Sequence, residues 1–260
     1  MIEILPIPAL TDNYIWAITD HKNTVIIDPG DAEPVISFLE ERNLTLSGIL
    51  VTHQHPDQIN GIAQLVELQP AIPVWAPANE KIPHATKLLH DGDEVDLAIG
   101  GIILKVLDVP GHTKGHIAYI GELPGNQPFL LSGDTLFSAG CGRLFEGTPE
   151  QMLSVMRKFR ALPDSTWVYC THEHTLSNLA FAMTVEPANP DIQQRIMDVT
   201  VLREQNRPSL PCTIGNEKKV NPFLRWDSLQ LKIAVEDWAD TQLTDDISIF
   251  TAVRKWKDKF

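Results

Sequence analysis

The chain has 260 residues, of which 43% are hydrophobic and 21% are charged. This balance is typical of an ordinary globular protein and argues against a disordered or fibrous one. The formal net charge is −13. It argues against a nucleic-acid partner, because such binding depends on a basic surface that neutralises phosphates.

The N-terminal segment and the cysteines bear on the compartment in which the chain works. Residues 1–16 contain no basic region followed by an apolar run, and no window approaches the roughly 20 apolar residues that span a bilayer. The three cysteines, Cys141, Cys170 and Cys212, are scattered and odd in number. They therefore match neither a disulfide framework nor a CxxC zinc motif. We expect a cytoplasmic protein with reduced thiols and no membrane partner, and we take it to be a monomer.

The first two thirds of the chain alternate short β-rich runs with amphipathic stretches, which predicts an α/β domain. The expected helices cover residues 32–42, 61–68 and 149–162. The last of them is preceded by Thr148 as a helix-capping residue and begins at Pro149. The expected strands are residues 14–19, 24–27, 48–52, 102–109, 117–121, 129–132 and 166–170.

The character of the sequence changes after His172, where helical periodicity replaces the β signal. The expected helices are residues 175–185, 190–204, 226–240 and 245–256. Between the second and third of these, residues 207–225 contain three prolines and a glycine, which predicts a long irregular connection. We therefore divide the chain into a first domain over residues 1–173 and a helical second domain over residues 174–260.

Histidines are concentrated in three short loops that follow predicted strands. Six of the nine histidines lie in them. The loops are His53-Gln54-His55-Pro56-Asp57-Gln58, Gly111-His112-Thr113-Lys114-Gly115-His116 and His172-Glu173-His174. A fourth loop, Ser132-Gly133-Asp134-Thr135, ends a predicted strand on a carboxylate.

Metal chemistry explains this concentration better than separate structural roles for each histidine. Imidazole and carboxylate are the ligands of Zn²⁺ and related divalent ions, and a catalytic site leaves one position open for water. His53 and His55 are two residues apart, so an extended loop start would point both to one side, and Asp57 would continue that period. The order and spacing of these loops predict a catalytic metal centre.

These motifs resemble the metallo-β-lactamase superfamily, whose signature is THxHxDH followed by a later His, an Asp and another His. The resemblance implies an αββα sandwich with two metals between its two sheets. It also implies that His53, His55 and His112 bind the first metal and that Asp57 and His172 bind the second. Asp134 would bridge the two metals.

Further runs resemble bacterial glyoxalase II, the family of hydroxyacylglutathione hydrolases, over essentially the whole chain. The most specific evidence comes from the second domain, because many hydrolases share the metal motif and few share this C-terminal part. The runs are Gly140-Cys-Gly-Arg143-Leu-Phe145-Glu-Gly-Thr148, Thr171-His-Glu173 with Thr175-Leu-Ser-Asn178, Asn221-Pro-Phe-Leu-Arg225 and Val253-Arg254-Lys-Trp-Lys257-Asp-Lys-Phe260.

The resemblance implies a small-molecule substrate, a hydroxyacyl thioester of glutathione such as S-D-lactoylglutathione. Glutathione carries two carboxylates, and arginine can bind a carboxylate bidentately. The implied substrate contacts are Arg143, Phe145, His174, Asn178, Arg254 and Lys257.

The mechanism implied by the resemblance is hydrolysis by metal-activated water. The metal is expected to be zinc, as one or two ions, with iron or manganese as alternatives, and the catalytic carboxylates are Asp57 and Asp134. Water with its pKa lowered toward ~7 attacks the thioester carbonyl. The leaving thiolate needs little assistance, because a thiol has a pKa of only about 8.5. No serine or cysteine nucleophile is required.

The sequence departs from the family motif at Gln58, where a histidine would complete the second metal site. A glutamine amide oxygen is a weaker zinc ligand than an imidazole nitrogen, so the second metal should bind less tightly or not at all. Gln54 also differs from the commoner histidine, but that position is not a ligand. His174 stands where the family more often has tyrosine.

Three alternatives stay open from the sequence. One is another hydrolase of the same fold, such as a lactonase or a β-lactamase, which would leave the C-terminal runs unexplained. Another is a persulfide dioxygenase, which holds a single iron by two His and one Asp and would tolerate Gln58. The third is a catalytically impaired homologue that still binds glutathione.

Overall fold

The computed structural model describes residues 2–260, and its contacts divide the chain into two compact units. Unit 1 comprises Met1–Val109, Lys114–Gly133 and Tyr169–His172. Unit 2 comprises Pro110–Thr113, Asp134–Val168 and Glu173–Phe260. The predicted division at residues 173 and 174 stays a prediction, because the two units are interleaved along the chain.

The first sheet of unit 1 is mixed and has the strand order β1-β2-β3-β4-β5-β6. The first three strands pair antiparallel, and the last three add in parallel. Its central strands have a buried, β-branched character that suits a sheet covered on both faces. The strands are β1 (Glu3–Ala9), β2 (Asn13–Thr19), β3 (Asn23–Ile27), β4 (Thr45–Leu50), β5 (Val74–Pro77) and β6 (Lys87–Leu89).

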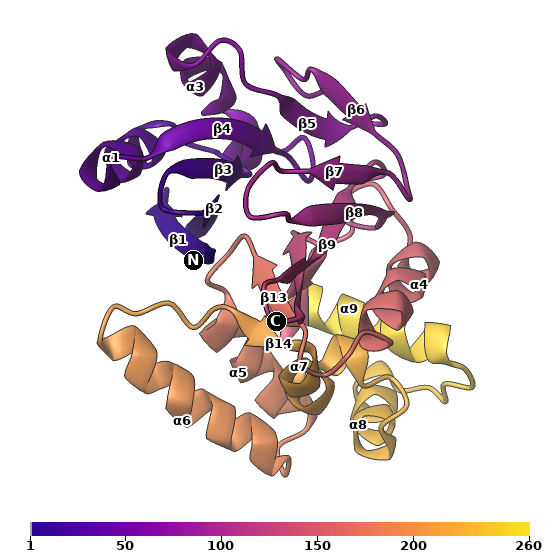
Figure 1. Ribbon diagram of the computed structural model, residues 1–260. Coiled ribbons are helices and arrows are strands. Elements are labelled where there is room, and N and C mark those ends of the chain that lie inside the picture. Colours follow the sequence, from indigo (N-terminus) through magenta and orange to yellow (C-terminus); the bar gives the residue numbers. More distant parts are fainter. Residues whose placement is uncertain (1) are drawn as a thin grey trace. The chain divides into compact units, whose positions relative to one another are not determined.

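Helices α1 (Glu33–Arg42) and α3 (Ile62–Leu68) cover one face of this sheet (Figure 1). Val35 and Phe38 of α1 share one apolar cluster with Ile62 and Leu65 of α3 and with the inward residues of the strands. Burial of such side chains is the main stabilising contribution to this layer. The sequence predicted β2, β3, β4, α1 and α3 to within a few residues, and it missed β1, β5 and β6.

A second sheet packs on the other face of the first within unit 1. It contains β7 (Glu94–Asp96), β8 (Ile103–Asp108), β9 (Ile117–Leu123), β10 (Gln127–Gly133) and the end of β13 (Trp167–Cys170). Two long-range hydrogen bonds join the sheets: Tyr119 Oη donates to the Val51 carbonyl at 2.7 Å, and Trp16 Nε1 donates to the Cys170 carbonyl at 2.9 Å. Of these strands, the sequence did not predict β7.

Unit 2 is mostly helical. It opens with the short hairpin β11 (Leu136–Phe137) and β12 (Gly140–Cys141), followed by α4 (Pro149–Arg160). Thr148 and Gln151 form a capping box at the start of α4, which confirms the predicted cap. The later helices are α5 (Thr175–Val185), α6 (Pro190–Glu204), α7 (Ile214–Val220), η1 (Pro222–Leu224), α8 (Leu229–Ala239) and α9 (Asp246–Lys259).

The expectation of an irregular connection over residues 207–225 is wrong. This segment contains β14 (Cys212–Thr213), α7 and η1. Thr213 caps α7 through the Asn216 N–H, and Asn221 caps η1 through the Phe223 N–H. The prolines obscured these elements because Pro222 starts η1 and Pro211 directly precedes β14, so neither interrupts a regular element.

A buried polar network from α7 holds the β11–β12 hairpin. Glu217 accepts from the Ala139 N–H at 2.7 Å, and Asn221 Nδ2 donates to the Phe137 and Gly140 carbonyls. Burial raises the pKa of Glu217. Because these contacts satisfy backbone groups of the hairpin, α7 fixes the segment that follows Asp134.

Candidate functional site

The loop after β4 places two histidines together in unit 1. His53 is fully buried, and its Nε2 lies 3.1 Å from His55 Nδ1. The ring of His116 stacks on His53 with centroids 4.5 Å apart. Asp57 does not continue an extended period, because Pro56 starts the short helix α2 (Pro56–Ile59).

The protonation of His53 is set by two residues beside it. Thr52 Oγ1 donates to Asp28 Oδ2 at 2.9 Å, and the Thr52 N–H donates to Asp28 Oδ1 at 2.7 Å. Since its only proton goes to Asp28, Thr52 Oγ1 accepts from His53 Nδ1 at 3.0 Å. The lone pair of His53 is therefore on Nε2, which is a nitrogen that can bind a metal.

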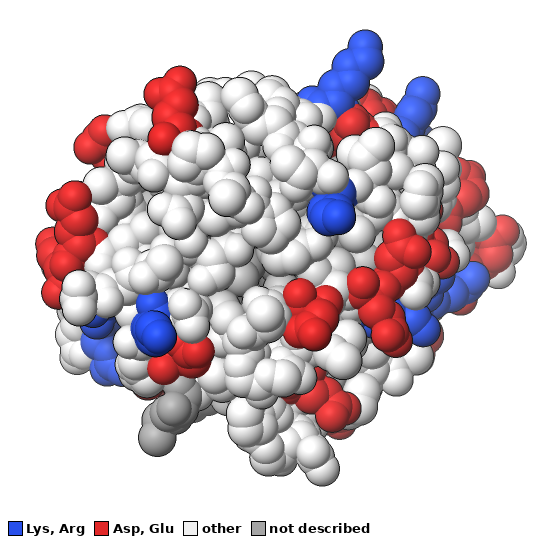
Figure 2. All heavy atoms as spheres, turned by 45° about the horizontal axis from the view of Figure 1, so that its top comes forward, with Lys and Arg blue, Asp and Glu red and all other residues white. Residues whose placement is uncertain are grey.

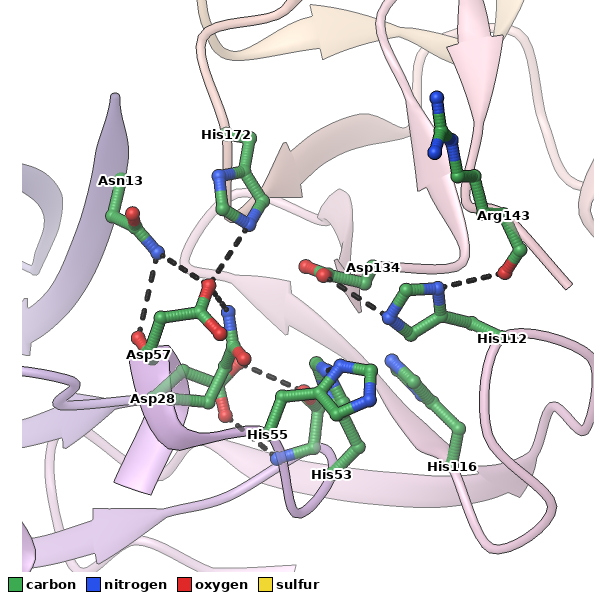
Figure 3. A network of polar contacts seen from close by, with 12 residues as sticks. Asn13, Asp28, His53, His55, Asp57, His112, His116, Asp134, Arg143 and His172 are labelled. Atoms are coloured by element: carbon green, nitrogen blue, oxygen red, sulfur yellow. Dashed lines mark hydrogen bonds and ion pairs between the residues drawn. The ribbon is translucent and has the colours of Figure 1, made fainter. Parts of the chain in front are cut away.

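Asp57 is surrounded by nitrogen atoms from three parts of unit 1 (Figure 3). Its Oδ2 lies 3.1 Å from Asn13 Nδ2, 2.9 Å from Gln58 Nε2 and 3.3 Å from His172 Nε2. On the other side of the His172 ring, Nδ1 lies 2.9 Å from Asp12 Oδ1. The carboxylate of Asp12 orients the His172 ring so that Nε2 faces Asp57.

Gln58 is fully buried beside Asp57. Its amide nitrogen donates to Asp57, and its amide oxygen Oε1 has no hydrogen-bond partner. A buried acceptor without a partner costs about 1–3 kcal/mol. Gln58 thus presents a donor, and not its oxygen, to the carboxylate that the sequence assigned to the second metal.

In unit 2, His112 and Asp134 form a second group of ligand type. His112 Nδ1 donates to the Arg143 carbonyl at 2.9 Å, which leaves the Nε2 lone pair 3.3 Å from Asp134 Oδ2 (Figure 3). Both side chains are buried. Gly142 lies against them: a Cβ added there would be 2.0 Å from the Asp134 carbonyl oxygen and 2.9 Å from His112 Nδ1. Only glycine fits this close approach.

The donor chemistry of both groups fits a divalent cation. In each group, an imidazole Nε2 faces a carboxylate oxygen at 3.3 Å, while its Nδ1 is held by an oxygen atom. A lone pair opposite a carboxylate is unfavourable unless a proton or a cation lies between them. The amide of Gln58 is the exception, because it turns its N–H groups toward Asp57.

The basic side chains predicted to contact substrate lie near one another in unit 2. Burial, together with the positive charges of Arg254 and Arg143, lowers the pKa of Lys257 to about 8. Lys257 Nζ donates to the Ser177 carbonyl at 3.2 Å. Three cations so close together repel one another, and an anionic ligand would relieve this repulsion.

The remaining predicted contacts differ in how much of each side chain is accessible. Phe145 is 63% exposed, with its ring edge-on to His112, and the His174 ring is edge-on to Phe137. Asn178 is buried and donates to the Ser138 carbonyl at 3.0 Å. Arg254 is also buried: it donates to the Cys141 carbonyl and pairs with Asp258.

The cysteines do not resemble nucleophiles. All three are buried and free, and burial raises the pKa of Cys141 to about 11. A thiol with this pKa is protonated near neutral pH, and the thiolate is the reactive form.

Known proteins similar to this chain include metal-dependent hydrolases, in agreement with the histidine and aspartate groups described above. A model described as "Hydroxyacylglutathione hydrolase C-terminus" matches residues 173–260, and one described as "Metallo-beta-lactamase superfamily" matches residues 10–172. The chain belongs to the hydroxyacylglutathione hydrolase family of the metallo-β-lactamase superfamily. This confirms the family and the α/β fold class that the sequence motifs indicated.

Relatives and solved structures show how far the similarity extends. Proteins named hydroxyacylglutathione hydrolase from Cupriavidus metallidurans and Photobacterium profundum are 47% and 49% identical, with 100% of both chains covered. The crystal structure of ETHE1 from Myxococcus xanthus is similar in fold, with 24% identity, a TM-score of 0.64 and coverage of 99% of this chain and 98% of that one.

In this hydroxyacylglutathione hydrolase family member, several residues that orient the ligand side chains were not predicted from the sequence. Asp28 has a φ of 53°, which is unusual for a residue other than glycine, and it holds the loop that carries His53. Asp12 and Asn13 stand at the start of β2, far from the histidine loops in sequence. Only the short polar run Thr11-Asp12-Asn13 before a predicted strand could have signalled them.

Proposed function

We propose that the chain hydrolyses S-2-hydroxyacylglutathione thioesters, with S-D-lactoylglutathione as the substrate, to a 2-hydroxy acid and glutathione. This reaction is the second step of methylglyoxal detoxification. The observation that carries the proposal is the match of the helical segment 173–260 to the hydroxyacylglutathione hydrolase model. The metal-binding loops alone fit many hydrolases, whereas this segment distinguishes the family.

Membership of the superfamily and the histidine and aspartate donors indicate a metal cofactor. We assign His53, His55 and His112 to a first ion, Asp57 and His172 to a second, and Asp134 to both. Zinc suits these ligands best, with iron or manganese as alternatives. When bound, such an ion lowers the pKa of water and polarises a carbonyl.

The side chains of the chain itself orient the donors and the substrate. Thr52, Asp12 and the Arg143 carbonyl each hold the Nδ1 atom of one histidine, which leaves Nε2 as the nitrogen that can bind a metal. Asp57 and Asp134 are the carboxylates of the catalytic centre.

We assign the glutathione carboxylates to Arg143 and Lys257, with Phe145 and His174 contacting the rest of the substrate. Arg254 and Asn178 were also predicted as contacts. Their present hydrogen bonds support positions behind the site, where they hold Cys141 and Ser138.

We propose a cytoplasmic, monomeric protein. Three buried free thiols suit a reducing compartment. Among the described residues, no helix is long and apolar enough to cross a membrane. Figure 2 shows charged side chains of both signs scattered around uncharged surface, without an extended basic patch among the residues described on that face. This supports a small-molecule substrate and not a nucleic acid.

Hydrolysis of S-D-lactoylglutathione, followed by the loss of thioester absorbance, tests the proposal. We expect turnover by purified protein loaded with zinc, manganese or iron. Glutathione binding without turnover at any loading would support the catalytically impaired homologue instead. Sulfide-dependent oxygen uptake by the iron-loaded protein, without thioester hydrolysis, would support a persulfide dioxygenase.

A further inference from the structure

The surroundings of Asp57 suggest how this chain differs at its second metal position. Asn13 Nδ2 and Gln58 Nε2 both donate to the same oxygen, Oδ2, at 3.1 and 2.9 Å. A carboxylate offers about four lone-pair directions over its two oxygens. Two amide donors therefore fill the lone pairs of Oδ2, and an ion bound there would have to displace one of them.

Rotation of the Gln58 amide into an orientation that binds metal is unfavourable unless a cation already lies between its oxygen and Asp57. Turning it over would put Oε1 beside the Asp57 carboxylate, so that two acceptors would face each other. It would also move Nε2 to the buried place where Oε1 has no partner. The observed orientation, with nitrogen toward Asp57, is therefore the favourable one without a cation.

We propose that Gln58 is a positioning residue: its amide N–H holds the Asp57 carboxylate in place of a second-metal ligand. As a consequence, the chain binds one divalent ion tightly and a second one only weakly. The inference rests on the proposed metal-dependent function, but it concerns the number of ions and not the reaction catalysed.

A histidine at position 58 would both bind a metal and fix Asp57, whereas Gln58 performs only the second of these two roles. An imidazole there could bind a metal, and the metal would in turn fix Asp57. Gln58 instead fixes Asp57 directly through its N–H group, which has no lone pair to offer a cation. The orientation of Asp57 should therefore depend on residue 58 even when a single ion is bound.

Metal stoichiometry tests the proposal. Metal-free protein is titrated with Co²⁺ while its visible absorption is recorded, and zinc is counted after dialysis against a chelating resin. We expect the native chain to saturate near one equivalent and to retain one zinc ion. Gln58→His should retain two, with affinity for the second ion raised about tenfold or more.

Two further variants separate ligand and donor effects. Gln54→His adds a histidine to the same loop at a position that is not a ligand, so it should remain at one equivalent. Gln58→Met keeps the side-chain length but removes the donor. It should still bind one ion, while kcat falls and KM changes little, because Asp57 loses its support.

The outcomes distinguish a failure of the assignment of Gln58 from a failure of the proposed function. Two chelator-resistant ions in the native chain would overturn it, even if the protein hydrolyses the thioester. So would unchanged kcat in Gln58→Met at a normal metal content. Failure of hydrolysis with one ion bound would overturn the proposed function and leave the assignment of Gln58 intact.

Discussion

Each unit contains a histidine–aspartate pair with the same arrangement. The pair is His112 with Asp134 in unit 2 and His172 with Asp57 in unit 1. Each imidazole donates from Nδ1 to an oxygen atom and faces a carboxylate with Nε2 at 3.3 Å. They differ in what packs against the aspartate. The Asn13 and Gln58 amides donate to the carboxylate of Asp57, whereas the backbone of Gly142 packs against the main-chain carbonyl of Asp134 and against His112.

This difference shows that a ligand pattern in a sequence does not by itself fix the number of ions. The same two residue types, histidine and aspartate, can have different neighbours, and at Asp57 two amides already satisfy part of the carboxylate. The neighbours matter, because a carboxylate that is partly removed from water, such as that of Asp57, is stabilised by a positive charge or by hydrogen-bond donors.

The largest effect should come from removing a ligand of the His112 group. His112→Ala should lower kcat/KM by more than about 100-fold and reduce the zinc retained, since even residues behind the ligands are worth about 10- to 100-fold. Zinc analysis and thioester hydrolysis measure both effects. His84→Ala removes an exposed histidine and should change neither. Full zinc retention by His112→Ala would show that the two groups had been assigned wrongly.

A smaller but still large effect is expected at the glycine that supports Asp134. The methyl group of Gly142→Ala would collide with the Asp134 carbonyl and His112. We expect kcat/KM to fall about tenfold or more and stability to fall by about 1–3 kcal/mol. Denaturant unfolding and hydrolysis are the measurements. Gly125→Ala, where a Cβ meets no atom within 4 Å although the φ of +92° strains alanine, is a control for activity and not for stability. Equal activity of the two variants would contradict the close packing.

An intermediate effect is expected at Asp28, which acts on His53 through Thr52. In Asp28→Asn, one carboxylate oxygen becomes an amide donor, so the Thr52 hydroxyl or N–H loses its acceptor. The proton on His53 Nδ1 is then no longer fixed, and zinc affinity should fall about tenfold. Competition with a chromophoric chelator measures this change. An unchanged affinity would mean that Thr52 does not set the protonation of His53.

The smallest effect concerns the pH dependence of substrate binding. Lys257, with a pKa near 8, carries its charge below this pH and loses it above. Attraction for a glutathione carboxylate is therefore present below pH 8, and KM should rise as the pH increases through 8. Lys257→Met should have a higher KM that no longer varies in this range. A KM that is flat from pH 7 to 9 in the native chain would exclude Lys257 from substrate binding.

Regular periodicity made much of the fold predictable, and short or irregular elements were missed. The predicted helices α4, α5, α6 and α9 are each at least 11 residues long. By contrast, β6 and β7 have three residues each, too few for an alternating pattern. Helix α7 was lost among prolines, because its caps Thr213 and Asn221 were not recognised.

The site was predictable in the identity of its donors but not in their support. Spacing singled out His53, His55 and His112, because side chains that bind metal cluster in short loops. It could not show that Asp12 would orient His172, since the two are 160 residues apart. Nor could spacing show which atom of Gln58 faces Asp57, because that orientation depends on packing around a buried amide.

Hydrolysis of S-D-lactoylglutathione by the metal-free chain during stepwise addition of zinc tests the central claim most directly. We expect the rate of thioester loss to rise from near zero and to level off near one equivalent of zinc per chain. Absence of hydrolysis at every zinc loading, in protein that remains folded and binds the metal, would contradict the account.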